Sequence, residues 1–341
     1  MTSPFYLFPL PQLVYSIIIN SMTMTQQILI SMCSSKANSI VKSVRREKRS
    51  ISLIVQDNEF VTVVVHDPYE QLLIGQVPEL AADWPMNKRL TINGKSKRFD
   101  YSEEKCVLGT IWDDVEVGTM EIIKYFDALF GAKVELLEMF DYSGCQIMKW
   151  LQRHQDHLLQ VAFYSRKDTI FEVEALNEII RDCEAHHIGV CADTGGKPFK
   201  IQNSHGKCVM FRCTIDTVFT VENIMQIEAP QIYLTNRWYE NEEIHQFIGH
   251  WMNGGNPYLK ALRLPCEHFN EQVATSGIPV QWNPERRYYQ SDQRDFCFSM
   301  DGGFEVQRDD GTKALFNISI DEFFSFVVEK ALDFVDDESL E

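Results

Sequence analysis

The stretch that decides how this chain begins to fold is FPLPQLVYSIIINSMTMTQQILISMCSSKANSIVKSV, residues 8–44. After Pro11, whose missing N–H costs nothing in the first turn of a helix, the apolar residues fall on one helical stripe. Thr23 and Gln26 have the spacing of a capping box that opens a second helix, and a third helix is predicted after Ser34-Ser35. Three such short helices bury too little surface to be stable alone, so they must pack on the rest of the chain or on a partner. The first stripe consists of Leu13, Val14, Ile17, Ile18 and Met22.

These residues resemble an F-box, a short helical module that binds a Skp-type adaptor. The resemblance is carried by Leu10-Pro11 at the start of the first helix, by the apolar stripe, and by the run Ile30 to Lys36 followed by Ile40-Val41-Lys42. It is closest to the large nematode family that joins an F-box to an F-box-associated domain. Gln12 stands where many F-boxes carry an acidic residue, Thr23 to Thr25 lacks the usual proline, and the third helix has no tryptophan.

The resemblance implies that residues 5–45 dock the chain onto a cullin–RING ubiquitin ligase, while the remainder captures the protein to be ubiquitinated. Cys33 is expected to be a buried core thiol on a helix that contacts the adaptor. The residues expected to bind the adaptor are Leu10, Pro11, Val14, Ile18, Met22, Ile28, Met32, Cys33, Ile40 and Val41.

The composition is that of an ordinary globular protein, with 45% hydrophobic and 24% charged residues in a chain of 341. The 32 basic and 49 acidic residues give a net charge of -17, which disfavours nucleic acid as a partner because it repels phosphate backbones. Nine cysteines without a C-x-x-C pair indicate reduced thiols in the cytoplasm or nucleus. The apolar N-terminus lacks a basic n-region and is interrupted by prolines, so neither a secretory signal nor a membrane span is expected.

After residue 50 the apolar period changes from that of a helix to that of strands. Residues 50–118 alternate apolar and polar positions, and Asn93-Gly94 is a strong signal for a two-residue hairpin, so a small antiparallel meander is predicted. Near the C-terminus, residues 266–332 are expected to form a β-hairpin and a closing segment. Residues 333–341 are mostly acidic and are expected to be a solubilising tail.

Between these parts, residues 119–265 alternate helical stripes with short apolar strands, and Ser143, Thr169 and Asn241 are the expected helix caps. A helix–strand unit cannot bury its apolar face alone, so stacked units are predicted to give one parallel sheet with helices on one side. The fold class expected is therefore α+β, with helix–strand repeats that resemble a degenerate leucine-rich-repeat horseshoe. The strand cores expected side by side are Val161-Ala162-Phe163, Ile188-Gly189-Val190, Ile232-Tyr233-Leu234 and Leu262-Arg263-Leu264.

Part of this region also resembles the F-box-associated domain of the same nematode family. The resemblance spans Ile232 to Leu264, and a second match covers Gly302 to Val306 with Arg308 to Ala314, where Asp310-Gly311 predicts a turn between two strands.

Few residues suggest catalysis. Asp193-Thr194-Gly195 looks like an aspartic-protease loop, but that chemistry needs two carboxylates that share a proton, and no second Asp-Thr-Gly or Asp-Ser-Gly occurs. His245 and His250 are five residues apart, so their rings lie on different helix faces and do not form a zinc pair. We therefore expect no catalytic residue, no cofactor and no metal.

A polar loop after one strand offers the best candidates for binding a target protein. Arg237, Trp238 and Tyr239 lie in this loop, and packing of the two rings into the core is an equal alternative. Trp251 lies on an apolar helix stripe and is expected in the core. The expected function is a non-catalytic substrate receptor, and the alternatives are an interaction module without a ligase or a hydrolase that uses Asp193.

Overall fold

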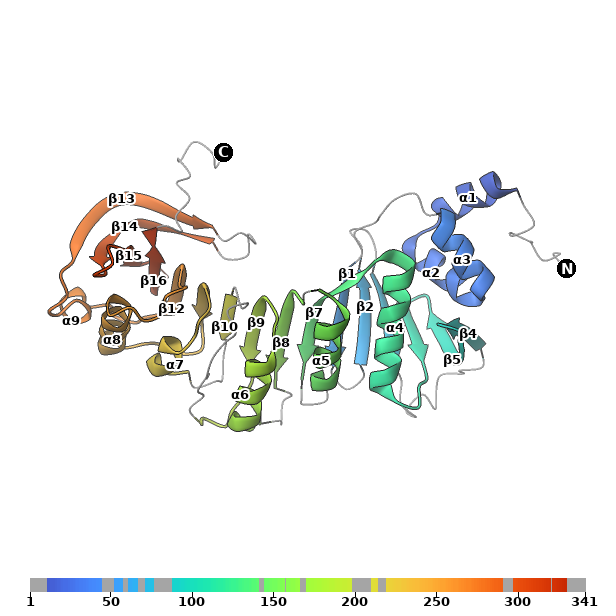
Figure 1. Ribbon diagram of the computed structural model, residues 1–341, viewed down its shortest axis with the longest axis horizontal. Helices are drawn as coiled ribbons and strands as arrows, with labels where there is room; N and C mark the ends of the chain where they lie inside the picture. Colours follow the sequence, from blue (N-terminus) through green and yellow to red (C-terminus); the bar gives the residue numbers. More distant parts are fainter. Residues whose placement is uncertain are drawn as a thin grey trace. The chain divides into compact units, whose positions relative to one another are not determined.

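The computed structural model of the chain is mixed α/β and divides into two compact units, Met1–Leu159 and Gln160–Glu341 (Figure 1). The expected mixture of helices and strands is confirmed, whereas the domain boundaries drawn from the sequence stay predictions. The residues described by the structure are 11–44, 52–57, 61–66, 71–76, 88–140, 144–156, 158–165, 170–197, 210–213, 219–290, 297–319 and 321–329.

The first unit begins with three short helices. The capping box predicted at Thr23 is present, because the Gln26 N–H donates to Thr23 Oγ1 at 3.2 Å and the Thr23 N–H donates to Gln26 Oε1 at 3.2 Å. Pro11 is the residue that caps the first helix, and its carbonyl accepts the N–H of Val14 at 2.9 Å. The three helices are α1 (Gln12–Asn20), α2 (Met24–Cys33) and α3 (Ser35–Val44).

Two of these helices, α2 and α3, contact a longer helix of the same unit, α4 (Val115–Phe130). The Tyr125 side chain of α4 is 4% exposed, its hydroxyl lies 2.6 Å from Ser31 Oγ, and it accepts a hydrogen bond from Asn38 Nδ2 at 2.9 Å. Burial raises the pKa of Tyr125 above its ordinary value, so the hydroxyl stays protonated. Helices α2 and α3 thus pack on the rest of the unit, and α1 packs on α3.

The sheet of the first unit differs in topology from the predicted meander. The order of its strands is β7-β1-β2-β3-β6-β5-β4, and β3 pairs with β6 in parallel, as β1 does with β7, while the other pairs are antiparallel. A purely antiparallel meander is therefore wrong, because alternation of apolar residues identifies strands without identifying their partners. The hairpin predicted at Asn93-Gly94 is confirmed, with positive φ at both residues (48° and 78°). The elements are β1 (Ser52–Asp57), β2 (Val61–His66), β3 (Gln71–Gln76), β4 (Lys88–Ile92), β5 (Lys95–Ser102), β6 (Val107–Thr110), β7 (Lys133–Met139) and α5 (Cys145–His154).

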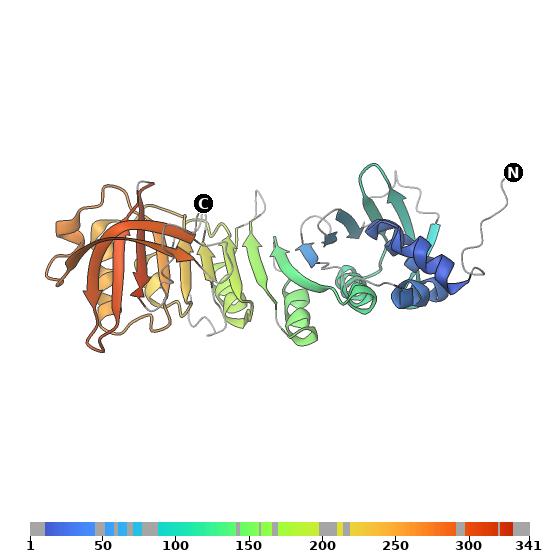
Figure 2. The same cartoon turned by 90° about the horizontal axis from the view of Figure 1, so that it is seen from above.

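The second unit contains the predicted parallel sheet. Val161 aligns with Ile188, and Ile232 aligns with Leu262, so the predicted strand cores lie in one continuous sheet and the prediction is confirmed. One further strand, β10, lies between β9 and β11 and is parallel to both, so the cores at Ile188 and Ile232 are not side by side as expected. Helix α6 (Val173–Asp182) lies on one face of these strands (Figure 2). The parallel strands are β8 (Gln160–Tyr164), β9 (His187–Cys191), β10 (Met210–Cys213), β11 (Gln231–Leu234) and β12 (Ala261–Pro265).

One of the three predicted helix caps differs in the structure, and the other two lie outside the described residues. Helix α8 is capped by Glu240, which exchanges hydrogen bonds with Glu243, and Asn241 lies inside the helix, where its side chain donates to the carbonyl of His268. The predicted cap Thr169 lies outside the described residues, as does Ser143 before α5. The helices are α6 (Val173–Asp182), α7 (Val221–Met225), α8 (Asn241–Met252) and α9 (Glu271–Ala274).

Four antiparallel strands extend the parallel sheet from β12, beginning with β16, and β13 and β14 are long and bent (Figure 1). The predicted turn between β14 and β15 is confirmed, since the Arg308 N–H donates to the Thr312 carbonyl at 2.9 Å and Gly311 has φ of 85°. Trp251 of α8 is 1% exposed and meets Phe326 edge-on at a centroid distance of 5.0 Å, which confirms its place in the core. The strands are β13 (Gln281–Gln290), β14 (Cys297–Gln307), β15 (Lys313–Ile318) and β16 (Phe323–Val328).

Candidate functional site

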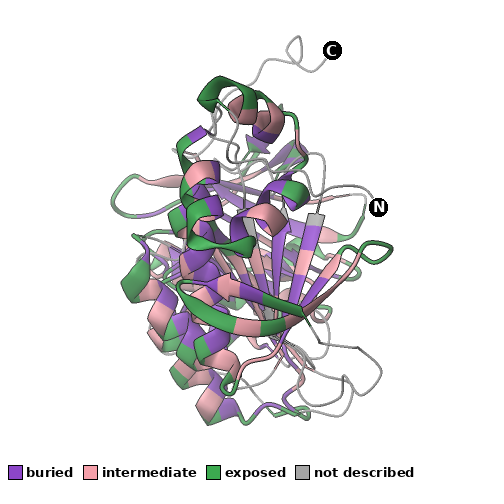
Figure 3. Ribbon diagram, turned by 90° about the vertical axis from the view of Figure 1, so that its right-hand side faces the viewer, coloured by how far each residue is buried: buried purple, intermediate pink, exposed green. Residues whose placement is uncertain are grey.

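Helix α1 exposes an aliphatic face. Leu13 is 65% exposed, Ile17 is 60% exposed and Val14 is 39% exposed, whereas Ile19 on the other side of the helix is fully buried. Figure 3 shows exposed residues along this helix, at the top of the view. A contiguous row of exposed aliphatic side chains is typical of a surface that binds another protein. We call Leu13, Val14 and Ile17 the α1 face.

The residues predicted to bind an adaptor fall into three groups. Ile28, Met32 and Val41 are buried and form the interior of the helical unit. Pro11, Val14 and Cys33 are exposed, while Ile18, Met22 and Ile40 are half-buried. Cys33 was expected to be a buried thiol, and this is wrong because the chain turns to an extended residue at Ser34, which leaves the end of α2 open to solvent. Leu10 lies outside the described residues, and Leu13 and Ile17 were omitted from the predicted set although the apolar stripe contains both.

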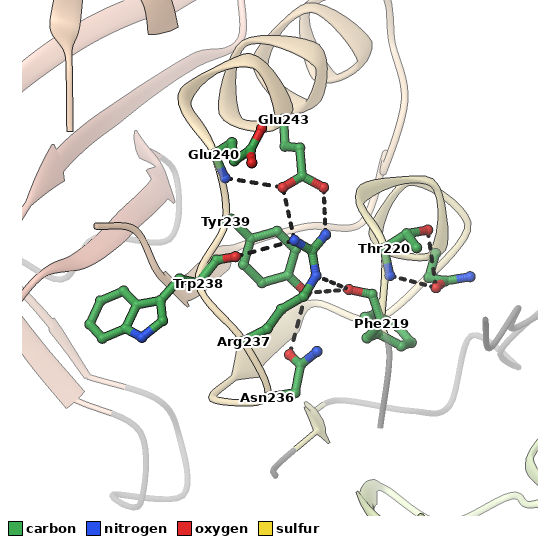
Figure 4. Close-up of polar contacts among 9 residues, drawn as sticks. Phe219, Thr220, Asn236, Arg237, Trp238, Tyr239, Glu240 and Glu243 are labelled. Atoms are coloured by element: carbon green, nitrogen blue, oxygen red, sulfur yellow. Dashed lines mark hydrogen bonds and ion pairs between the residues drawn. The ribbon is translucent and has the colours of Figure 1, made fainter. Parts of the chain in front are cut away.

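The loop between β11 and α8 is fixed by the guanidinium of Arg237 (Figure 4). Its Nη1 donates to Glu243 Oε2 at 3.0 Å, its Nη2 pairs with Glu243 Oε1, and its Nε donates to the Phe219 carbonyl at 3.0 Å. Burial alone would lower the pKa of Arg237, but the hydrogen bonds to Glu243 outweigh it and raise the pKa. Because most of its donors are used by Phe219, Trp238 and Glu243, Arg237 is a positioning residue rather than a free contact for a target.

Trp238 and Tyr239 point in opposite directions. Tyr239 is 2% exposed, its hydroxyl donates to the Phe219 carbonyl at 2.8 Å, and the Arg237 guanidinium lies 4.1 Å from its ring centroid. Trp238 is 49% exposed, and Figure 4 shows its indole directed away from the polar cluster. Of the three residues predicted to contact a target, only Trp238 offers a large accessible side chain on this rigid loop.

The Asp-Thr-Gly segment forms a turn. Asp193 Oδ1 accepts the N–H of Gly195 at 2.7 Å, and Thr194 is fully buried with its hydroxyl donating to the Lys197 carbonyl at 3.0 Å. The Asp193 carboxylate therefore stabilises the backbone after β9. This is the geometry of a turn.

Metal and membrane sites are not indicated by the described part of the chain. Among its residues, no group of three or more histidine, cysteine, aspartate or glutamate side chains could hold a metal ion. The Nδ1 atom of His245 lies 3.2 Å from the carbonyl oxygen of Ala274. None of the described helices is both long and apolar enough to cross a bilayer.

Comparison with known proteins identifies one segment of the chain. Residues 198–264 match the F-box associated domain family, and the predicted resemblance over Ile232 to Leu264 lies inside this range. The match includes β10, β11, the Trp238 loop, α8 and most of β12. An F-box is not itself detected in the N-terminal helices. No match was found among curated proteins or among solved structures.

Proposed function

We propose that this protein is the substrate-recognition subunit of a cullin–RING ubiquitin ligase, with its N-terminal helices acting as an F-box. The observation that carries the proposal is the F-box associated segment at 198–264, in the same chain as a three-helix unit that exposes aliphatic residues. In this proposal the helix–strand series of the second unit is a degenerate repeat scaffold that holds a target protein. The ubiquitin chemistry belongs to the partners, so the chain itself is non-catalytic and acts in the cytoplasm or nucleus.

The α1 face is the proposed contact with a Skp-type adaptor. Aliphatic side chains at the centre of an interface stabilise a complex by being removed from water, and Leu13 and Ile17 have the most accessible surface to lose on this helix. If Ile17 were replaced by aspartate, binding of the adaptor would remove the carboxylate from water without giving it a partner.

The test is a binding measurement between the purified chain and a purified Skp-type adaptor. Ile17→Asp is expected to weaken binding at least tenfold, which corresponds to about 1.4 kcal/mol. The matched control is Val117→Asp, which replaces another exposed aliphatic residue (45% exposed) on α4 of the same unit. If Ile17→Asp binds the adaptor as tightly as the control, the α1 face is not the docking surface.

A simple interaction module without a ligase is the alternative proposal. This alternative allows the same contact with the adaptor, but it predicts that no cullin copurifies with the chain and the adaptor. Retention of a cullin with the wild-type chain, and its loss with Ile17→Asp, supports the ligase proposal over this alternative.

A further inference from the structure

Arg308, at the end of the β14 strand, is a buried cation without an ion-pair partner among the described residues. The residue is 9% exposed, and its guanidinium lies 4.0 Å from the ring centroid of Trp251. Its Nη2 donates to the Gly255 carbonyl, while its Nε is buried and has no hydrogen-bond partner in the described part of the chain. A buried charge of this kind is normally paired, because removal from water is costly.

Asp310 is the charged residue that acts on Arg308 in the described part of the chain. Burial lowers the pKa of Arg308, and the charge of Asp310 opposes this shift. Asp310 is exposed, and its Oδ1 accepts the N–H of Thr312 at 2.8 Å, so this carboxylate stabilises the turn.

Arg308 lines a cavity of about 340 Å³, whose wall holds a second cation and aromatic side chains beside apolar residues and the carboxylate of Asp310. Lys260 adds a second cation at an exposed position, and Tyr258, 59% exposed, adds an aromatic surface. Trp251 also lines the cavity, and its indole N–H is buried with no hydrogen-bond acceptor in the described residues. Two cations and an unused donor therefore face one carboxylate, that of Asp310.

We propose that this cavity, which we call the Arg308 pocket, is an oxyanion-binding site that takes a carboxylate or phosphate group. Such a group accepts hydrogen bonds in the plane of a guanidinium and would compensate the buried charge. The pocket is distinct from the Trp238 loop, because Trp238 precedes the first turn of α8 and Trp251 lies on its last turn, roughly 15 Å along the helix axis. The proposal does not depend on adaptor binding.

The experiment follows the indole N–H signals of the full chain, labelled with ¹⁵N-tryptophan, during titration with inorganic phosphate at constant ionic strength. The Trp251 signal, assigned with Trp251→Phe, is expected to shift along a saturable curve. Lys260→Gln is expected to weaken this binding several-fold, and Asp310→Asn to strengthen it several-fold, since each changes one exposed charge at the cavity. Arg308→Gln is expected to abolish saturation, and Arg181→Gln, an exposed arginine on α6 paired with Asp182, is the control that leaves it unchanged.

Two further probes distinguish the source of the anion. Acetyl-Gly-Glu-Gly-amide, compared with its glutamine counterpart, tests an acidic side chain of a polypeptide, whereas phosphate tests a phosphate group. A saturable response to either that requires Arg308 supports the site. A linear response shared by wild type and Arg308→Gln, or no response to any probe, overturns the proposal and leaves Arg308 as a structural cation on Trp251.

Discussion

Trp238 and Tyr239 are adjacent in the β11–α8 loop, and we expect Trp238 to bind a target and Tyr239 to stabilise the fold. Alanine substitutions distinguish these two roles. Tyr239→Ala removes a fully packed ring and is expected to cost about 3–5 kcal/mol of stability. With a Tm change of about 2–4 °C per kcal/mol for a unit of this size, the expected drop is roughly 6–20 °C. Trp238→Ala, by contrast, removes a ring that is 49% exposed and makes no hydrogen bond through its indole among the described contacts, so a change within about 0.5 kcal/mol is expected.

Tyr239→Phe separates the contribution of the hydroxyl group to stability from that of the ring. It deletes the hydroxyl that donates to the Phe219 carbonyl, but this carbonyl still accepts from Arg237 Nε at 3.0 Å. The acceptor is therefore not left unsatisfied, and the expected loss is about 1 kcal/mol.

Thermal unfolding of the full chain, followed by circular dichroism, measures all three variants, and a target pull-down is run on the same samples. Trp238→Ala should retain its Tm and lose the target, whereas Tyr239→Phe should keep the target. Equal losses of Tm for Trp238→Ala and Tyr239→Ala would refute the assignment of one ring to the surface and the other to the core.

Three further substitutions test contacts within each of the two units. Gly255→Ala places a Cβ 2.0 Å from His250 Nε2, so the imidazole must move, and denaturant unfolding should show a loss of about 1–3 kcal/mol; an unchanged midpoint would contradict this contact. Tyr125→Phe removes the hydroxyl that joins α4 to α2 and α3 and should cost about 1–3 kcal/mol, with faster amide exchange in α2 and α3; unchanged exchange would show that the bonds are dispensable. The hydrogen bond from Asn283 Nδ2 at 2.7 Å lowers the pKa of Glu305, so its contribution is present above the ordinary glutamate pKa and is lost as pH falls through the lowered value. Glu305→Gln should reduce this acid sensitivity of the unfolding free energy, and an identical pH profile would argue against the shift.

Local signals in the sequence were sufficient where one residue pattern has one physical outcome. Thr23 with Gln26 could be predicted as a capping box because both partners lie within one turn, and Asn93-Gly94 could be predicted as a hairpin because few residues accept positive φ. The parallel direction of four strands in the second unit followed from apolar strand cores that recur after each helix, but the place of β10 between β9 and β11 was not predicted.

Outcomes that depend on tertiary neighbours could not be predicted in this way. The parallel pairing of β3 with β6 depends on where the chain returns, which alternation does not encode. Asn241 was the expected cap of α8, but Glu240 and Glu243 satisfy each other's donors and displace it. The burial of Tyr239 rather than Trp238 depends on the carbonyl of Phe219, a distant residue in the sequence. The burial of Arg308 against Trp251 likewise depends on neighbours that are distant in the sequence.

In the proposed function, one chain holds an adaptor and a target through separate surfaces. Quantitative mass spectrometry of proteins that copurify with wild type, Ile17→Asp and Trp238→Ala tests it most directly. We expect Ile17→Asp to lose the Skp-type adaptor and cullin but keep the target, and Trp238→Ala to lose the target but keep the adaptor. Loss of the same proteins from both variants, or of neither set from either, would contradict it.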